Sequence, residues 1–268
     1  MKSQLKVFGS LLIVAILTLV VFQNCSNVKF SGKELANTSS GTPVTPGTPT
    51  TSGTPIPPVV DTPAPPVICD PFSTGSTCAA GEGLKGSLYY LASNDTNSPR
   101  AKIADIIDFG LKATSQVVLS QLNIPTRNWT DGFPGSDGTP IKNTDGQPLN
   151  EWFALDLAGT IRVNSELAKS SDDYQFAQFA LMTDDGSILE IDGTTVINHD
   201  NQHSPLWKCA AAAVNLKSGD LHQIRVRYFQ GPRNQIALQL MWRPWSQHAS
   251  SCDEKGGFTA VPKTVLFN

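Results

Sequence analysis

The C-terminal half of the chain contains segments in which apolar and polar side chains alternate with a period of two. The pattern is clearest in residues 224–229 and 236–243. Successive side chains of a β-strand point to opposite faces of a sheet, so this period predicts strands with one buried face. Further strands are expected at residues 152–157, 159–163, 174–182 and 187–191, and a tight turn at Gly193 before a strand at residues 196–197.

This distribution predicts an all-β fold, because many strands with few helices favour an antiparallel β-sandwich. Residues 100–111 are expected to form a short helix. Residues 130–148, which are rich in Gly, Asp and Pro, are expected to form a long loop. We therefore assign residues 68–268 to one sandwich domain of ordinary size.

The segment that precedes this domain has a different composition. Residues 31–67 are dominated by Thr, Pro, Gly and Ser, and Gly-Thr-Pro recurs at Gly41, Gly47 and Gly53. Such a segment has too few large apolar groups to offset the entropy of ordering, and its prolines favour an extended spacer. We interpret residues 25–67 as a disordered linker that presents the domain away from a surface. A tether that provides clearance alone is equally compatible.

The first 24 residues have the layout of a secretory signal peptide, with Lys2 and Lys6 before an apolar run at residues 7–22. The run is shorter than the roughly 20 residues that span a bilayer, which favours a cleaved signal. Cys25 ends a stretch that resembles a bacterial lipoprotein cleavage box, although Phe22 and Asn24 depart from the usual residues. We expect lipidation of Cys25 and a location at the outer membrane or cell surface. Ordinary secretion and an uncleaved anchor are the alternatives.

Four further cysteines, an even number, predict disulfide bonds in an exported chain. We favour pairing Cys69 with Cys78 across a short loop, and Cys209 with Cys252 to tie the C-terminal tail to the body. A structural zinc site is the alternative, but the sequence has no Cys-x-x-Cys or paired-His spacing to support it.

Charge and motifs restrict the function classes. The net charge of −3 and a pI near 5.8 offer no basic footprint for nucleic acid. The sequence has neither a Gly-x-Ser-x-Gly nor a His-Glu-x-x-His motif. Asp184 and Glu190 are carboxylates of the kind that a glycosidase needs, but nothing singles them out. We therefore expect a binding module and no enzymatic activity.

Asp184 and Asp185 are adjacent carboxylates at the expected end of a strand. Two like charges at a partly buried site repel unless they splay into water or a cation neutralises them. Carboxylate oxygens are hard ligands that suit calcium. The alternative is a simple turn, because Asp and Gly commonly break the chain between strands.

A series of short motifs, in order and spacing, resembles the protective-antigen-type (PA-fourteen) domain of bacterial toxins, adhesins, glycosidases and yeast flocculins. The resemblance extends over residues 83–245. It is carried by residues 83–90, 158–161, 173–176, 184–187 and 191–193, and by positions 216, 219, 224–226, 228–229 and 238–242. It implies a β-sandwich, in agreement with the fold that the period of two predicts.

In the sugar-binding members of that family, a cis peptide joins the Asp pair, which binds calcium together with two neighbouring sugar hydroxyls. The resemblance therefore implies Asp184 and Asp185 as calcium ligands. The third side-chain ligand is usually an amide on the loop before the last long strand, which makes Asn234 the first choice and Gln235 the second. Turn formation is the alternative role for both residues.

Sugar specificity in the resembling adhesins comes from loops around the ion. The corresponding candidates are the loop residues 198–203, which include His199, Asp200 and Asn201, together with Trp207, Asn234 and Gln235. Packing beside Cys209 is the alternative for Trp207. His199 and His203 have the spacing of zinc ligands on a helix, but their polar segment ends in Pro205 and favours a solvated loop.

We therefore expect a calcium-dependent carbohydrate-binding module of the adhesin type, held at the cell envelope by a lipid anchor. Its expected partner is a glycan or a cell-surface polysaccharide. The alternative is an envelope structural or protein-interaction module that uses the same sandwich without calcium or sugar. An accessory domain that serves a separate hydrolase is a third possibility.

Overall fold

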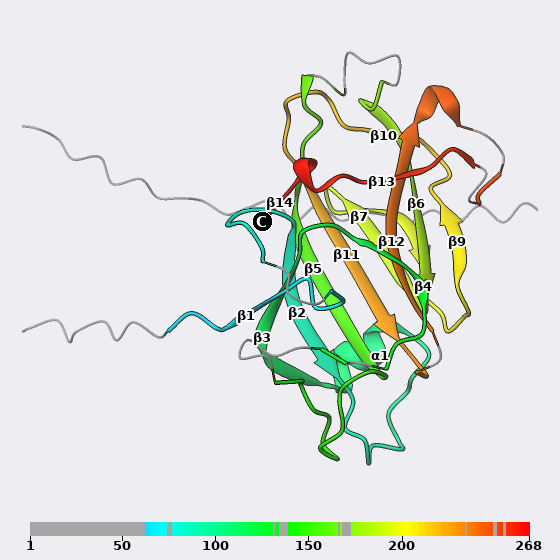
Figure 1. Cartoon of the computed structure of the whole chain (residues 1–268). Helices are drawn as coiled ribbons and strands as arrows, with labels where there is room; N and C mark the ends of the chain where they lie inside the picture. Colours follow the sequence, from blue (N-terminus) through cyan, green and yellow to red (C-terminus); the bar gives the residue numbers. More distant parts are fainter. Residues whose placement is uncertain are drawn as a thin grey trace, which may run out of the picture. The chain divides into compact units, whose positions relative to one another are not determined.

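The computed structural model describes residues 63–73, 77–130, 132–133, 139–165, 167, 173–233, 235–248, 251–253 and 256–268. These residues form two β-sheets that face each other, with one short helix, α1 (Ile103–Phe109), beside them (Figure 1). All strand pairings are antiparallel except the one between β1 and β3. The expected all-β sandwich is confirmed.

The first sheet has the strand order β1-β3-β2-β5-β11-β7-β8, and β14 pairs with β5. Its strands are β1 (Val67–Cys69), β2 (Leu84–Tyr90), β3 (Leu111–Leu119), β5 (Phe153–Ile161), β7 (Ser187–Ile191), β8 (Thr194–His199), β11 (His222–Gln230) and β14 (Leu266–Phe267).

The second sheet has the order β10-β6-β12-β13, with β4 beside β12 and β9 beside β6. Its strands are β4 (Asn123–Arg127), β6 (Phe176–Asp184), β9 (Leu206–Cys209), β10 (Val214–Asn215), β12 (Ile236–Pro244) and β13 (Thr259–Ala260). The short 3-10 helices η1 (Trp245–Gln247) and η3 (Lys263–Val265) follow β12 and precede β14.

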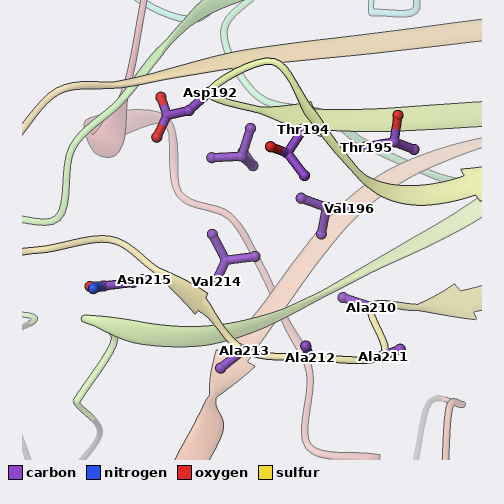
Figure 2. Close-up of a pocket in the computed structure, with 11 residues that line it drawn as sticks. Asp192, Thr194, Thr195, Val196, Ala210, Ala211, Ala212, Ala213, Val214 and Asn215 are labelled. Carbon is purple, nitrogen blue, oxygen red and sulfur yellow. The ribbon is translucent and has the colours of Figure 1, made fainter. Parts of the chain in front are cut away.

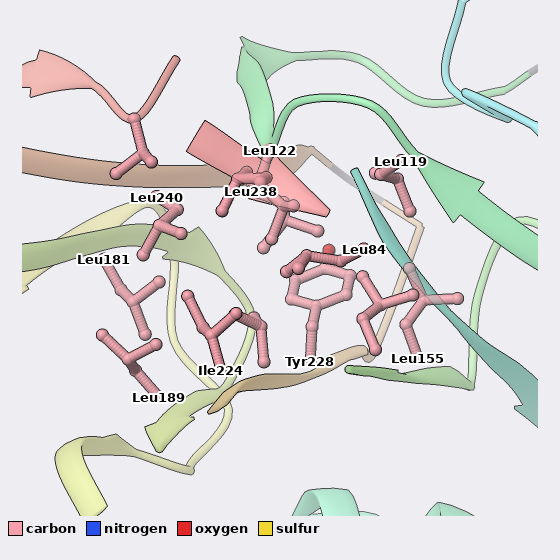
Figure 3. Packing of buried hydrophobic residues seen from close by; sticks show 14 of the residues in the cluster. Leu84, Leu119, Leu122, Leu155, Leu181, Leu189, Ile224, Tyr228, Leu238 and Leu240 are labelled. Carbon is pink, nitrogen blue, oxygen red and sulfur yellow. The ribbon is translucent and has the colours of Figure 1, made fainter. Parts of the chain in front are cut away.

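The core lies between the sheets and is built from the alternating residues that predicted strands. On β11, Ile224, Val226 and Tyr228 are buried, and on β12, Leu238 and Leu240 are buried against them. Figure 3 shows the aliphatic side chains of both sheets meeting around the ring of Tyr228. The period of two therefore placed the two central strands correctly.

Several elements differ from the expectation. The strands expected at residues 152–157 and 159–163 are one continuous strand, β5, because Gly159 pairs in register with Ile224 and does not end the ladder. The helix expected at residues 100–111 covers only Ile103–Phe109. The loop at residues 130–148 is described in part and contains one isolated bridge, between Lys142 and Pro148.

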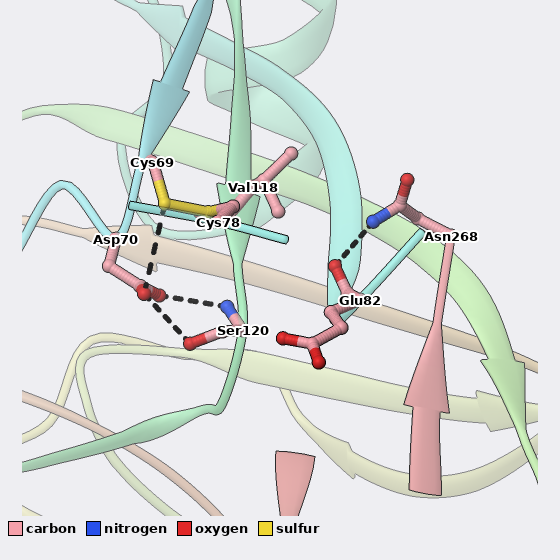
Figure 4. The surroundings of a disulfide bond; sticks show 7 residues. All are labelled: Cys69, Asp70, Cys78, Glu82, Val118, Ser120 and Asn268. Carbon is pink, nitrogen blue, oxygen red and sulfur yellow. Dashed lines mark hydrogen bonds between the residues drawn. A yellow bond between two sulfur atoms is a disulfide. The ribbon is translucent and has the colours of Figure 1, made fainter. Parts of the chain in front are cut away.

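Both expected disulfides are present, Cys69–Cys78 and Cys209–Cys252. The first ties the end of β1 to a neighbouring loop. Figure 4 shows that the Asp70 carboxylate beside it accepts hydrogen bonds from the Ser120 backbone N–H (2.8 Å) and hydroxyl (2.7 Å). The second disulfide ties β9 to the C-terminal segment across 43 residues. A disulfide of this kind typically contributes about 2–4 kcal/mol to stability.

The signal peptide, Cys25 and most of the linker lie outside the described residues. β1 begins at Val67, the last residue that we assigned to the linker, and the Gln116 N–H donates to the carbonyl of Pro66 (2.8 Å). Among the described residues, no helix is both long and apolar enough to cross a membrane.

Candidate functional site

Three connections that cross from one sheet to the other contribute to one site. The Asp184–Gly186 corner joins β6 to β7, residues 200–205 join β8 to β9, and residues 231–235 join β11 to β12. Residues from all three connections line one cavity of about 300 Å³. The site therefore forms where the chain changes sheets, and its residues come from distant parts of the sequence.

The Asp184–Gly186 corner is held against the end of β11. The Asp185 N–H donates to the Phe229 carbonyl (3.2 Å), and the Phe229 N–H donates to the Gly186 carbonyl (3.0 Å). A Cβ atom at Gly186 would lie 2.4 Å from Cε1 of Phe229, so only glycine fits here. The Tyr228 hydroxyl lies 2.5 Å from the Asp184 carbonyl oxygen, to which it donates from inside the core. The peptide bond between Asp184 and Asp185 is cis.

The two carboxylates have different surroundings. Asp185 is anchored, because one oxygen accepts from the Gly231 N–H (2.6 Å) and the other from the His203 N–H (3.0 Å). The Asp184 carboxylate has no hydrogen bond or ion pair within the described part of the chain, and it lines the cavity. Asp184 is only 7% exposed and Asp185 only 4%. One acid is therefore fixed in place and its neighbour is left open to a ligand.

Burial and mutual repulsion dominate the electrostatics of the pair. Burial raises the pKa of Asp184 to about 7, and the adjacent Asp185 charge adds to the rise. Burial also raises the pKa of Asp185, although the hydrogen bonds from Gly231 and His203 oppose this. Without a cation, the site therefore favours protonation of Asp184 near neutral pH.

Of the other predicted residues, Gln235 lines the cavity together with Gln202, His203, Ser204 and Pro232. The Gln235 carbonyl accepts from the side-chain amide of Gln230 (2.9 Å), which closes the loop from inside. Asn234, the first choice for a third ligand, lies outside the described residues. The acid pair, Pro232 and Gln235 therefore lie around the same cavity.

The remaining candidates do not line this cavity. His199 stacks on His203 with ring centroids 4.0 Å apart, and burial lowers the pKa of His199 to about 4. The Asp200 carboxylate accepts from the Ile103 N–H (2.8 Å) at the start of α1, and the Asn201 N–H donates to the His199 carbonyl (3.1 Å). These residues shape and support the loop around the cavity.

Trp207 lies on β9, where its ring packs 5.8 Å from that of Phe258. Cys209, two residues further along the same strand, forms its disulfide with Cys252. The ring therefore packs against the C-terminal segment, near the disulfide that we gave as its alternative environment.

Comparison with known families bears on this site. Residues 150–256 match the family model described as the PA14 domain, the protective-antigen-type family that the sequence resembles. The chain contains a PA14 domain. The matched region includes the acid pair and all three connections around the cavity. No curated protein sequence matches the chain.

Similar solved structures include the PA14 domain of the MpAFP antifreeze protein, with a TM-score of 0.48, 15% identity, and coverage of 73% of this chain and 96% of that one. The PA14 sugar-binding domain from an RTX adhesin has a TM-score of 0.46, 16% identity, and coverage of 70% and 99%. An anti-sigma factor domain-containing protein has a TM-score of 0.43 and 16% identity. This chain covers only 48% of its length.

Some residues of the PA14 site have no sequence signal of their own. Ser204 and Pro232 line the cavity, and Tyr228 on β11 and Gly231 directly after it hold the acid pair. A Cβ atom at Gly231 would lie 2.7 Å from Oδ2 of Asp185, which explains the glycine at the start of this loop. The Gly-Pro dipeptide indicates a turn, but not what the turn contacts.

A larger cavity of about 440 Å³ lies elsewhere in the PA14 domain, between β8 and residues 210–215. Figure 2 shows Thr194 and Val196 on one side, and a run of alanines with Val214 on the other. Among the described residues that line it, Asp192 is the only ionisable one, and its carboxylate binds Nδ1 of His222 (2.7 Å). The acid-pair cavity is therefore the better candidate for specific polar recognition.

Proposed function

We propose that this chain is a calcium-dependent carbohydrate-binding module of the adhesin type, without enzymatic activity of its own. The observation that carries the proposal is the buried acid pair of a PA14 domain, in which Asp185 is anchored and Asp184 faces an open polar cavity.

The residues of the cavity suit a calcium ion. Carboxylate and amide oxygens are the hard ligands that calcium takes, at six to eight positions. Each oxygen of Asp185 already accepts one backbone hydrogen bond and keeps a second lone pair for an ion. A divalent cation would also remove the repulsion that contributes to the raised pKa of Asp184.

In this proposal Asp184 and Asp185 hold the ion, and Asn234 or Gln235 adds an amide oxygen. When bound, calcium supplies coordination positions for two neighbouring sugar hydroxyls. Gly231 and His203 keep the Asp185 carboxylate in one orientation, and Tyr228 fixes the backbone before it. Gln202, His203 and Ser204 would contact the sugar ring from the 200–205 connection.

A shallow site of this kind binds single sugars weakly. We expect millimolar affinity, or about 4 kcal/mol, so that adhesion requires many copies acting together. A glycan or polysaccharide on a cell, polymer or biofilm offers repeated hydroxyl pairs for such binding.

The test is a glycan array probed with the full-length chain in calcium and again with chelator. We expect binding to a subset of glycans that chelator removes and that added calcium restores. Thermal unfolding in the same buffers provides a second readout, because an ion that binds only the folded state raises the melting temperature. Glycan binding that is equal with and without chelator would contradict the calcium mechanism.

We also propose that lipidation of Cys25 displays the module on the cell envelope, at the outer membrane, with the Thr- and Pro-rich segment as its spacer. The support is the order of signal-like segment, cysteine and spacer in the sequence. In the Cys25→Ala variant, we expect the chain to leave the membrane fraction and to lose incorporation of a labelled fatty acid. Unchanged labelling of the variant would exclude Cys25 as the lipidated residue.

A further inference from the structure

A second polar cavity, of about 280 Å³, lies next to the acid-pair cavity. Four parts of the chain contribute to it: the segment after β2, the residue three before α1, the turn at residues 143–145, and the two residues before β5. Its lining residues are Leu91, Ala92, Ser93, Arg100, Asn143, Asp145, Glu151 and Trp152. None of them lines the acid-pair cavity, so the two are separate pockets.

A short chain of hydrogen bonds connects the two cavities. The Trp152 N–H donates to the Gly231 carbonyl (3.2 Å), and the Gly231 N–H donates to Asp185 (2.6 Å). The Trp152 carbonyl in turn accepts from the Leu91 N–H (2.9 Å). A single residue, Gly231, therefore separates the wall of the second cavity from the anchored acid.

Two further hydrogen bonds, made by the side chains of Gln202 and Glu151, link the segments that line the two cavities. The Gln202 amide, which lines the acid-pair cavity, donates to the Arg100 carbonyl (2.8 Å). The Arg233 N–H, on the loop that borders the acid pair, donates to the Glu151 carboxylate (3.2 Å). The same two connections, 200–205 and 231–235, thus support both cavities.

The lining of the second cavity offers an aromatic ring with a guanidinium on it. The Arg100 guanidinium carbon lies 4.9 Å from the centre of the Trp152 ring. Within the described residues, that guanidinium makes no hydrogen bond or ion pair. Trp152 itself has a φ of +55°, a strained conformation that is rare for a bulky residue. Strain of this kind at a cavity wall commonly marks a binding position.

The charges of the lining select a neutral ligand. Arg100 provides open donors, whereas Glu151 and Asp145 provide acceptors in the same cavity. An anion would meet the two carboxylates, and a cation would meet the guanidinium. A hydroxyl group donates and accepts at once, so a neutral sugar satisfies both sets, while the Trp152 ring positions the Arg100 guanidinium.

We propose that this cavity is a second sugar subsite, which takes the next residue of a neutral glycan whose first residue occupies the acid-pair cavity. The inference rests on the proposed function and extends it from one sugar to an oligosaccharide. Arg100 and Trp152 determine the preference for a longer glycan, and the acid pair determines binding of the first residue.

The test measures affinity for a short glycan relative to its own terminal sugar. The probes are methyl glycosides of glucose, mannose, galactose and fucose, and neutral di- and trisaccharides that end in each of them, titrated into the full-length chain in calcium. The variant is Arg100→Ala, which removes no hydrogen bond of the described residues. Its matched control is Arg162→Ala, whose guanidinium also lies over a ring, that of Phe267 at 5.1 Å, but outside both cavities.

We expect wild type to bind at least one oligosaccharide about tenfold more tightly than the matching methyl glycoside, as one charge-assisted hydrogen bond pair allows. Arg100→Ala should reduce this ratio to less than about twofold and leave the methyl glycoside affinity unchanged. Trp152→Asn, in which Asn tolerates the positive φ, should do the same. Arg162→Ala should keep the tenfold ratio.

Three results would overturn the subsite while the proposed function stands. They are methyl glycoside binding with no gain for any oligosaccharide, an equal loss of both affinities in Arg100→Ala, and a loss in Arg162→Ala that matches that in Arg100→Ala. If wild type binds none of the sugars in calcium, both the proposed function and the subsite are wrong.

Discussion

Asp184→Asn is expected to abolish calcium-dependent glycan binding, with a loss of affinity greater than about 100-fold. Even removal of a group that only orients a metal ligand typically costs 10–100-fold, and this change removes the charge of the ligand itself. Asparagine has nearly the same shape, and the Asp184 carboxylate has no hydrogen bond to lose within the described residues. The measurement is titration of calcium, and then of glycan, into the folded variant.

Asp185→Asn should also lose binding, because it removes both a calcium ligand and a hydrogen bond that holds the site together. Its two oxygens face the N–H groups of Gly231 and His203, and an amide can accept from only one of them through its oxygen. We therefore expect this variant to lose stability in addition to calcium. The control is Asp220→Asn, an exposed acid with one long ion pair to Lys217 (3.8 Å), which should bind as wild type does. Calcium-dependent glycan binding that survives in Asp184→Asn would remove this residue from the site.

The sheet cores could be predicted from the sequence because burial on one face imposes a period of two. β11 and β12 contain nine residues each and show the pattern at residues 224–228 and 238–242, and both lie centrally in their sheets. The short strands β10 and β13 contain two residues each and are too short to show a period. β1 was missed for a related reason, since its three residues follow directly on the proline-rich segment.

The candidate site could be predicted only in part. The acid pair is visible because its members are adjacent in the sequence. The groups that hold Asp185 are not, because Gly231 and His203 lie 46 and 18 residues away and reach it only when the sheet-crossing connections meet. Asp200 is a residue for which the sequence suggested a binding role and the structure shows a structural one. Its loop and chemistry suited a ligand contact, but tertiary structure uses the carboxylate to hold the start of α1.

The second cavity had no signal in the sequence at all. Arg100 was assigned to a helix and Trp152 to the start of a strand, whereas the structure places each just outside those elements. Trp152 leaves the extended conformation with a positive φ, which no local pattern predicts for a large aromatic residue. The residues that end regular elements, rather than those within them, therefore build both pockets.

The stability of the protein should also depend on calcium. Asp184→Asn should be more stable than wild type without calcium and less stable than wild type with calcium. In the calcium-free protein the pKa of Asp184 is raised from 3.8 to about 7 by burial and by Asp185. Between these values the folded protein holds a proton that the unfolded chain has released, so the free energy of unfolding falls as the pH rises. Because solvent reaches this carboxylate through the open cavity, we expect a fall of about 2 kcal/mol, roughly half the full linkage value.

Asp184→Asn lacks this group and should therefore be more stable than wild type, by about 2 kcal/mol, in calcium-free buffer above pH 7. Calcium at about 1,000 times its dissociation constant should stabilise wild type by about 4 kcal/mol and leave the variant unchanged. Urea unfolding of both proteins at pH 5, 6 and 8, with and without calcium, measures each term, and Asp220→Asn controls for the loss of a surface charge. Two results would show that the acids do not share a buried ion site: the same order of stability in both buffers, or a stability difference in calcium-free buffer that does not grow with pH. Both expected effects arise because two like charges lie side by side in a cavity, where only a cation can neutralise them.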